Sequence, residues 1–408
     1  MANAFEQVDW IAAEALMHLE DALVIANLAS KDKSSDFNVT PNGYKVGDTV
    51  RIKTRPEYET KTFATITPGS PGSGTIDTQN IRESTRNMTI ERLFDISVEV
   101  TAKERALDLE SFSEQVIQPA AWSLAESVDQ YVGTKILEAA GLYVAGGGST
   151  TKDVFGDAPD MAEARKTATE QQLSSTGRYV LADLSLEARL LGAPFFGTWN
   201  NRGPDGVPVF TNGMMGRAMG MDFFSSINFP QQSITASLID GAFAIATETG
   251  LSDPENQIGT SSLFCTGTGT VGPTSILAGA RLKIAGVRRP VIVASAPTPI
   301  SGDFTIALED PITEIIAEGA AVTIVGDALP MDIRGAIFDD RSLAIAMPIL
   351  DSPPDKPSFS ASNNGVSIRV VQGYDMTSKV ETLSMDLLVG AVAYDPRRIT
   401  LLADDLTP

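Results

Sequence analysis

The chain has 408 residues, 43% of them hydrophobic, which is enough for about two or three domains with buried cores. Lys and Arg number 31 against 52 Asp and Glu, and the formal net charge of -21 argues against sequence-specific DNA binding, because such a field repels nucleic acid. No apolar run is long enough to span a membrane, and acidic residues from Glu6 to Asp21 occupy the place of a signal peptide's basic start. We therefore expect neither a membrane-spanning nor a secreted protein.

The first 100 residues predict a helix followed by a two-stranded arm. Apolar residues over 8–28 have the spacing of an amphipathic helix. Alternating apolar residues at 46–52 and 90–100 mark two strands, and the segment between them is rich in Pro, Gly and Ser. An isolated hairpin of that length is marginal in water, so we expect the arm to lie on a neighbour.

The clearest helix is predicted over 102–140, where apolar residues recur three and four apart. Pro119 lies inside this run, so we expect a kink or a break there. The following GGGSTTK lacks the order GxxxxGK[ST] of a phosphate-binding loop, since Lys152 comes after the Ser and Thr residues. We therefore expect no nucleotide site and no cofactor.

The second half of the chain changes character twice. Residues 155–228 mix helix and strand patterns, with a short strand expected at 207–210. From 229 to about 330 the composition turns to Thr, Ser, Val, Ile and Gly, which predicts an inserted all-β domain. Within it GARLKIAG and GAAVTIVG share a pattern, which we interpret as related strands of a small barrel or sandwich, chance similarity being the alternative.

The chain closes with strand patterns. Val366, Ile368 and Val370 alternate with polar residues, which is the period of a half-buried strand. Residues 387–394 are apolar almost throughout and stop at a Pro turn, which is typical of a strand buried on both faces.

Side chains that carry chemistry are few. Cys265 is the only cysteine, so we interpret it as a small buried hydrophobe, and His18 in its apolar helical pattern as a partly exposed structural residue. The pairs at 339–340 and 404–405 read as solvated turn or terminal acids rather than the paired acids of a glycosidase. Without His or Cys clusters or a calcium loop, we expect no metal site and no enzyme.

The order of these parts resembles the major capsid proteins of tailed bacteriophages with the Hong Kong 97-type fold, closest to short-tailed-phage coat proteins that carry an inserted domain. The segments that carry the resemblance are the arm at 43–98, the helix at 102–140, the block DMAEARKTATEQQLSSTGRYVLADLSLEARLL, and the ending GVSIRVVQGYDMTSKVETLSMDLLVGAVAYDPRRITLL. The resemblance implies an α+β fold with a peripheral domain and its spine helix, an axial domain, an extended hairpin loop, an N-terminal arm and the inserted β-domain.

The resemblance also implies a division of the chain. The expected parts are an N-terminal helix and arm at 1–42, the hairpin loop at 43–98, the peripheral domain at 99–154, the first axial part at 155–228, the insertion at 229–330, a return to the peripheral domain at 331–364 and axial C-terminal strands at 365–408.

No catalytic side chain follows from the resemblance, but it points to contacts between subunits. The residues concerned are Arg51, Lys53, Arg55 and Lys61 on the arm, Arg288 and Arg289 on the insertion, and Pro119 in the spine helix. The arm cations would meet acidic surface of the adjacent subunit, or else protect solvated strand edges. The two insertion arginines would contact another capsomer, and the proline would be a flex point.

The implied partners follow the same resemblance. The chain would form hexamers and pentamers of an icosahedral phage head, assembled in the bacterial cytoplasm around a separate scaffolding protein and a portal. The procapsid would then expand as double-stranded DNA enters, without sequence-specific binding. The shell would be noncovalent, would not involve a membrane and could carry a decoration protein.

Two other classes of protein remain open on the sequence. A secreted, acidic, β-rich carbohydrate-active enzyme or adhesin would be a monomer with an aromatic-lined cleft, and the 7% aromatic content argues against it. A phage tail or decoration protein would also assemble, but it would not need a spine helix between an arm and a mixed domain.

Overall fold

The structure is a computed structural model that divides into two compact units. The first unit comprises Met1–Val50, Asn87–Ala236 and Leu329–Pro408, and the second comprises Arg51–Arg86 and Ser237–Ala328. The described residues are 3–32, 49–53, 85–101, 113–139, 142–145, 155–170, 173–174, 176–193, 215–234, 242–246, 260–268, 281–287, 291–300, 303–308, 312, 314, 316–324, 331–353, 357–376, 380–395 and 398–405.

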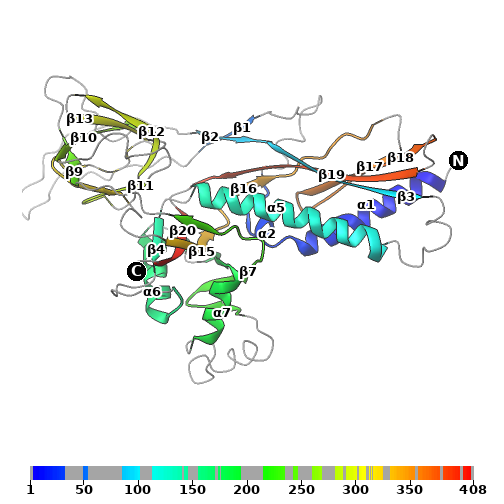
Figure 1. Cartoon of the computed structure of the whole chain (residues 1–408), viewed down its shortest axis with the longest axis horizontal. Coiled ribbons are helices and arrows are strands. Elements are labelled where there is room, and N and C mark those ends of the chain that lie inside the picture. Colours follow the sequence, from blue (N-terminus) through cyan, green and yellow to red (C-terminus); the bar gives the residue numbers. More distant parts are fainter. Residues whose placement is uncertain are drawn as a thin grey trace, which may run out of the picture. The chain divides into compact units, whose positions relative to one another are not determined.

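The first unit contains a five-stranded sheet covered by two long helices (Figure 1). The strand order is β16 (Leu343–Ala346), β19 (Val380–Ala393), β18 (Val366–Asp375) and β17 (Ser358–Asn363), with β3 (Arg92–Thr101) also paired to β19. All of these pairings are antiparallel. Helix α1 (Asn3–Ala22) packs on β17 and β18, while α5 (Gln118–Ala139) packs on β19 and β3 and also against α1. The short helix α2 (Ile25–Leu28) contacts α5.

The core between this sheet and its helices follows the predicted alternation on one face. Val366, Ile368 and Val370 are buried there, as predicted, and they belong to the same core as the apolar face of α1. Ser367 on the opposite face is buried as well, because its hydroxyl donates to the carbonyls of Met347 and Pro348. The prediction of a half-buried strand is therefore wrong at Ser367, where the earlier segment that contains Met347 and Pro348 covers the second face.

Strand β19 is buried on both faces, as its apolar run predicted. The buried residues of this run are Leu387, Leu388, Val389, Ala391 and Ala393. Over this run β19 pairs with β3 up to Val389 and with β16 from Gly390 to Ala393, and α5 packs on the strand, so a nearly continuous apolar run suits this position.

A seven-stranded sheet forms the other part of the first unit. Its order is β4 (Leu142–Ala145), β20 (Thr400–Asp405), β15 (Met331–Asp339), β5 (Arg178–Ala182), β7 (Met221–Ser225) and β6 (Arg217–Ala218), with β8 (Gln232–Ile234) also paired to β15. The β4–β20 and β5–β7 pairs are parallel, and the other pairings are antiparallel.

Two helices, α6 (Ala158–Glu170) and α7 (Leu184–Gly192), share one apolar core with this sheet. Met161 and Ala164 of α6 and Leu186 and Leu190 of α7 are fully buried in it. Helix α7 begins directly after β5 because Asp183 accepts a hydrogen bond from the Leu186 N–H at 2.7 Å, which satisfies one of the helix's free N-terminal donors.

The second unit contains a closed six-stranded barrel. Around the barrel the strands are β10 (Ser262–Thr268), β13 (Asp303–Leu308), β12 (Val291–Ile300), β11 (Arg281–Ile284), β14 (Ala321–Ile324) and β9 (Ala242–Ile245). The two segments that share a sequence pattern become β11 and β14, which pair with each other antiparallel. Closure leaves a barrel without an exposed edge strand, and its interior holds Leu263, Cys265, Ile284 and Phe304.

The predicted α+β class is confirmed by this combination of helices and sheets. Two details differ from the predicted segments. The strand expected at 90–100 follows a separate strand, β2 (Thr85–Thr89), and pairs as β3 with β19 rather than within the arm. The closing strands do not stay together, since β18 and β19 belong to the five-stranded sheet and β20 to the seven-stranded one. The domain limits themselves stay predictions, and the strand expected at 207–210 lies outside the described residues.

No helix among the described residues is both long and apolar enough to cross a membrane.

Candidate assembly surfaces

The arm cations lie on a short exposed strand where the structure describes them. Strand β1 (Thr49–Lys53) pairs with β2, and Arg51 and Lys53 are exposed on either side of the buried Ile52. The side chains of Arg51 and Lys53 therefore share one face of β1. Arg55 and Lys61, as well as Arg288 and Arg289 of the insertion, lie outside the described residues.

The arm is anchored where β2 leads toward β3. Met88 and Ile90 are buried, and the backbone of 89–90 crosses directly over Gly390 of β19. A Cβ at Gly390 would lie 2.6 Å from the carbonyl oxygen of Thr89 and 3.1 Å from the Cα of Ile90. Only glycine allows this close approach, so the base of the arm is fixed against the sheet.

Pro119 lies at a change of helix type. Residues Ser113–Ile117 form a π-helical turn, and the α-helix α5 begins at Gln118. Pro119 is thus in the first turn of α5, directly after the π-helical turn. The expected start of this helix at 102 lies outside the described residues, and the role of Pro119 as a flex point stays a prediction.

A buried carboxylate joins the N-terminal helices to the spine helix. Asp129 of α5 is fully buried and accepts hydrogen bonds from the backbone N–H groups of Val24 at 2.9 Å and Ala26 at 3.0 Å. Burial raises the pKa of the Asp129 carboxyl, and the hydrogen bonds from Ala26, Val24 and Ile25 oppose that rise. This single side chain thus caps the start of α2 and ties it to α5.

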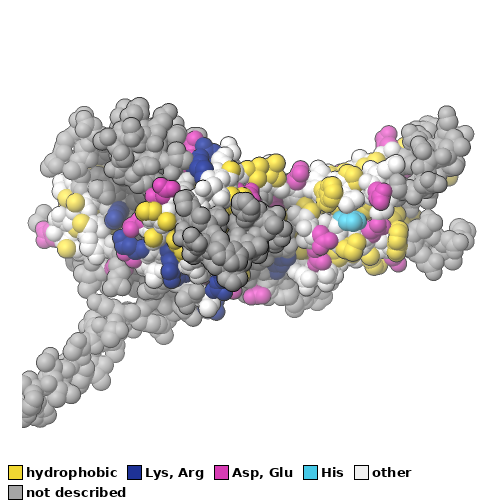
Figure 2. All heavy atoms as spheres, turned by 90° about the horizontal axis from the view of Figure 1, so that it is seen from below, with side chains coloured by type: hydrophobic (Ala, Val, Ile, Leu, Met, Phe, Trp, Pro, Cys, Tyr) yellow, Lys and Arg dark blue, Asp and Glu magenta, His cyan; other side chains and the backbone are white. Residues whose placement is uncertain are grey.

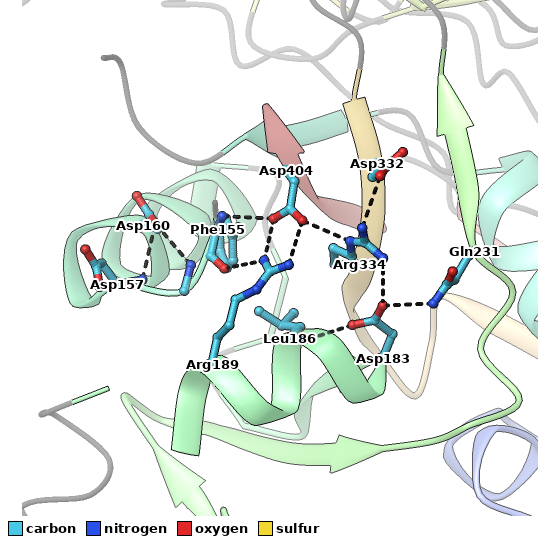
Figure 3. Close-up of polar contacts among 11 residues, drawn as sticks. Phe155, Asp157, Asp160, Asp183, Leu186, Arg189, Gln231, Asp332, Arg334 and Asp404 are labelled. Carbon is cyan, nitrogen blue, oxygen red and sulfur yellow. Dashed lines mark hydrogen bonds and ion pairs between the residues drawn. The ribbon is translucent and has the colours of Figure 1, made fainter. Parts of the chain in front are cut away.

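A second buried carboxylate, Asp404, holds the end of the chain in the seven-stranded sheet (Figure 3). The Arg189 guanidinium of α7 donates to both Asp404 oxygens, at 2.7 and 2.9 Å. The backbone N–H of Phe155 donates to one of these oxygens at 2.9 Å, and Nε of Arg334 donates to the other at 2.9 Å. One carboxylate therefore ties β20 to α7, to β15 and to the segment that precedes α6.

The same network continues through Arg334 to a second acid (Figure 3). Arg334 lies 3.3 Å from Asp183, the N-cap of α7, and 3.0 Å from Asp332. Although burial alone lowers the pKa of the Arg334 guanidinium, its hydrogen bond and charge interaction with Asp404 and the charge of Asp183 raise that pKa. The network is a structural brace, because each acid in it already has a basic or backbone partner.

The interpretation of 339–340 and 404–405 as solvated acids is wrong for two of the four residues. Asp339 and Asp404 are buried. Asp339 accepts from the Ser342 hydroxyl at 2.6 Å and pairs with Arg398. Buried carboxylates need such partners. Arg398 is 59 residues from Asp339 in the sequence, and the two arginines that bind Asp404 are 70 and 215 residues from it. Sequence pattern alone gave no signal for pairs so far apart.

Large apolar side chains are exposed on several elements of the first unit. Trp10 is 67% exposed and Met17 54% exposed on α1, and Trp122 is half-exposed on α5. Further exposed apolar residues are Leu93, Leu184, Ile227, Ile349, Phe359, Tyr374 and Met376. Figure 2 shows apolar and acidic side chains side by side around the only histidine on this face. Such surfaces mark contacts with other proteins when they gather into patches.

Two residues with reactive side chains have structural surroundings. His18 on α1 is partly exposed, as predicted, and its Nε2 lies 3.9 Å from Glu14. Cys265 is buried in the barrel, also as predicted, and burial raises the pKa of its thiol to about 12. Among the described residues, no three His, Cys, Asp or Glu side chains are placed to hold a metal ion.

Comparison with known proteins finds similarity in structure only. No protein-family model matches the chain, and no curated protein matches it. A solved structure from Mycobacterium phage Che8 is 12% identical, covers 93% of this chain and 90% of its own, and has a TM-score of 0.49. The capsid structure of the cyanophage P-SCSP1u is 11% identical, with coverages of 87% and 83% and a TM-score of 0.47.

The mature capsid of bacteriophage PhiM1 is also 11% identical, with coverages of 88% and 83% and a TM-score of 0.43. The chain is similar in structure to phage capsid proteins.

Proposed function

We propose that this chain is the major capsid protein of a phage head, in which copies of it assemble into hexamers and pentamers around double-stranded DNA. The observation that carries the proposal is how the arm strands continue into the five-stranded sheet. Two strands, β1 and β2, are followed directly by β3, which is built into the sheet that the spine helix α5 covers. A short strand pair is marginal on its own, so an arm anchored in this way suits contact with an adjacent copy.

Surface chemistry supports the same role. Exposed apolar side chains occur on α1, α5, α7, β3 and β18, so a subunit has apolar surface available for more than one neighbour. Many modest contacts per subunit make a shell stable while each contact stays reversible during assembly. A net charge of -21 suits a wall that encloses DNA without binding particular sequences, and a structural role needs no catalytic residue.

The proposed assembly also assigns roles to the arm cations, the insertion arginines and Pro119. Arg51 and Lys53, with Arg55 and Lys61, would meet acidic surface of the neighbouring copy, and Arg288 and Arg289 would contact another capsomer. Pro119, beside a change of helix type, would be a flex point when the procapsid expands. Assembly would use a separate scaffolding protein and a portal in the bacterial cytoplasm. The noncovalent shell of the virion could also carry a decoration protein.

Electron microscopy of bacteria that express this chain, alone and with a candidate scaffolding protein from the same genome, tests the proposal. Closed shells or tubes of capsomers are the expected result, and their lattice gives the arrangement of hexamers and pentamers. Soluble monomers in both cultures would contradict the proposed function.

A further inference from the structure

A shallow groove of about 570 Å³ lies beside α6 in the first unit. Ala162, Thr169 and Met219 line it with apolar atoms, and Arg165, Lys166 and Glu170 bring charges to it. Met219 lies in the turn between β6 and β7 and has a positive φ of 52°. A Cβ on the next residue, Gly220, would be 3.9 Å from the Arg165 guanidinium, which therefore lies over this turn.

The groove carries positive charge that the described residues leave uncompensated. Lys166 pairs with Glu163 at 2.8 Å and also interacts with Glu170, whereas the Arg165 guanidinium makes no ion pair or hydrogen bond with any described residue. Arg178 lies near it, and its guanidinium already donates to Thr169 and to the Leu173 and Ser174 carbonyls. Burial and then the charge of Arg165 lower the pKa of Arg178, so these two cations repel each other.

Helix α7 presents an exposed surface that combines apolar side chains with a negative charge. Leu184 is 51% exposed, and Ala188, one turn later, is exposed as well. Between them Glu187 is partly exposed, and its carboxylate makes no ion pair or hydrogen bond with any residue in the described part of the chain. Residues three and four apart lie on the same side of a helix, so one acid and two apolar side chains share this surface.

We propose that the α6 groove of one copy takes the exposed α7 surface of the next copy, with Glu187 of one against Arg165 of the other. This inference rests on the proposed function and names the contact that would link subunits within a ring. Both sides combine apolar atoms with one uncompensated charge, and the charges are of opposite sign. A second copy fits better than nucleic acid or a basic partner, because it offers a partner to both charges. Nucleic acid would attract only Arg165, and a basic partner would attract only Glu187.

The geometry of such a contact favours a ring. The two surfaces are different parts of the subunit, so the contact is head-to-tail, and each copy keeps one groove and one α7 surface for its neighbours. Both helices pack on the same core of the seven-stranded sheet, so the groove and the α7 surface belong to one rigid part of the subunit. Repetition of this contact would close a ring when the rotation between copies fits.

Cross-linking tests the contact directly. The double variant Ala162→Cys/Ala188→Cys is treated with a short bismaleimide, and Cys265 stays unreactive because its thiol is buried. We expect a ladder of covalent oligomers up to the ring size on a denaturing gel. An equal mixture of the two single variants should stop at dimers, because each subunit then carries only one reactive position.

Charge reversal makes the test specific. In the double-cysteine background, Arg165→Glu should lower the cross-linked fraction at least about tenfold, and Glu187→Arg added to it should restore the ladder. Arg92→Glu removes an exposed cation from β3, away from both surfaces, and should leave the ladder unchanged. Equal ladders in all of these variants would overturn the assigned pairing.

The outcomes separate this inference from the proposed function. Shells without a ladder would overturn the α6–α7 contact and leave the capsid role standing. A ladder from protein that never forms shells would support the contact and remove the capsid role. Neither shells nor a ladder would overturn both.

Discussion

The carboxylate of Asp129 on the spine helix accepts a hydrogen bond from the backbone N–H of Ala26, 103 residues earlier in the chain. The Val24 N–H donates to its other oxygen. Because the carboxylate is fully buried, these two donors have no water to replace it. One side chain thus holds the start of α2 on the spine helix, in addition to the apolar packing between α1 and α5.

Replacement of Asp129 by Ala should loosen the junction between α1 and α2. The buried Ala26 N–H and the partly buried Val24 N–H would lose their acceptor at about 1–3 kcal/mol each, so exchange of both amides should be about 10–100-fold faster. Hydrogen exchange followed by mass spectrometry of the peptide that covers 23–28 measures this. Glu126→Ala, on the exposed face of the same helix, is the matched control, and equal exchange in both variants would contradict the role of Asp129.

The same carboxyl should give a defined pH dependence. Burial raises its pKa above the usual 3.8, so the folded chain holds this proton more tightly than the unfolded chain. The stability that protonation adds is fully present below pH 3.8 and is lost as the pH rises through the raised folded value.

Relative to Asp129→Asn, the wild type should therefore gain unfolding free energy as the pH is lowered from about 7 to about 4. Urea titrations of both proteins at each pH give the difference, and Glu126→Gln should show none of this gain. A gain on raising the pH instead would show that the charged form is the favoured one.

The Asp404 brace should matter far more than an exposed ion pair. Asp404→Ala leaves the partly buried Arg189 and Arg334 without their shared acceptor, and we expect a loss of about 3 kcal/mol in unfolding free energy. Lys166→Ala removes a pair in which both side chains are more than half exposed, and it should change the same quantity far less. Denaturant unfolding of unassembled subunits compares the two. Similar losses would mean that the brace adds little.

Gly390→Ala should disturb the base of the arm. The new methyl group would lie 2.6 Å from the Thr89 carbonyl oxygen, and moving backbone apart costs about 1–3 kcal/mol. Gly192→Ala adds the same atom where nothing lies within 4 Å and should be nearly neutral. Thermal unfolding of both variants checks the contrast, which would vanish if the crossing of β2 over β19 were loose.

Trp122→Ser should impair assembly more than folding. Because the Trp122 side chain is half-exposed on α5, its loss should lower the unfolding free energy by about 1 kcal/mol or less. If it packs on another copy, the yield of shells should fall severalfold. Sedimentation of assembled and free protein measures the yield, with Ser123→Ala as the neighbouring exposed control. A full yield of shells would exclude Trp122 from the interfaces.

The arm cations provide a separate test of the proposed contact with the adjacent subunit. Arg51→Ser, Lys53→Ser and Arg55→Ser combined should slow assembly, while the unfolding free energy stays nearly constant because Arg51 and Lys53 are exposed. Light scattering during assembly follows the rate. Unchanged rate and unchanged shell stability would leave these residues as solvated strand-edge charges.

By itself the sequence determined the elements whose physics is local. The apolar spacing predicted α5 and most of α1, although the helix expected at 8–28 ends at Ala22 and is followed by the separate α2. The alternation at 366–370 and the apolar run at 387–393 predicted β18 and β19, and the shared pattern predicted β11 and β14 as two strands of a small barrel or sandwich. It also placed Cys265 in a core, because a lone apolar thiol in a strand pattern is more stable out of water.

Only the tertiary structure decided which residues from distant parts of the chain meet. It buried Ser367 under Met347 and Pro348, and it surrounded Asp404 with arginines from α7 and β15. A polar side chain looks the same in the sequence whether water or a distant donor satisfies it. Its burial depends on contacts across 19 to 215 residues, which no local periodicity encodes.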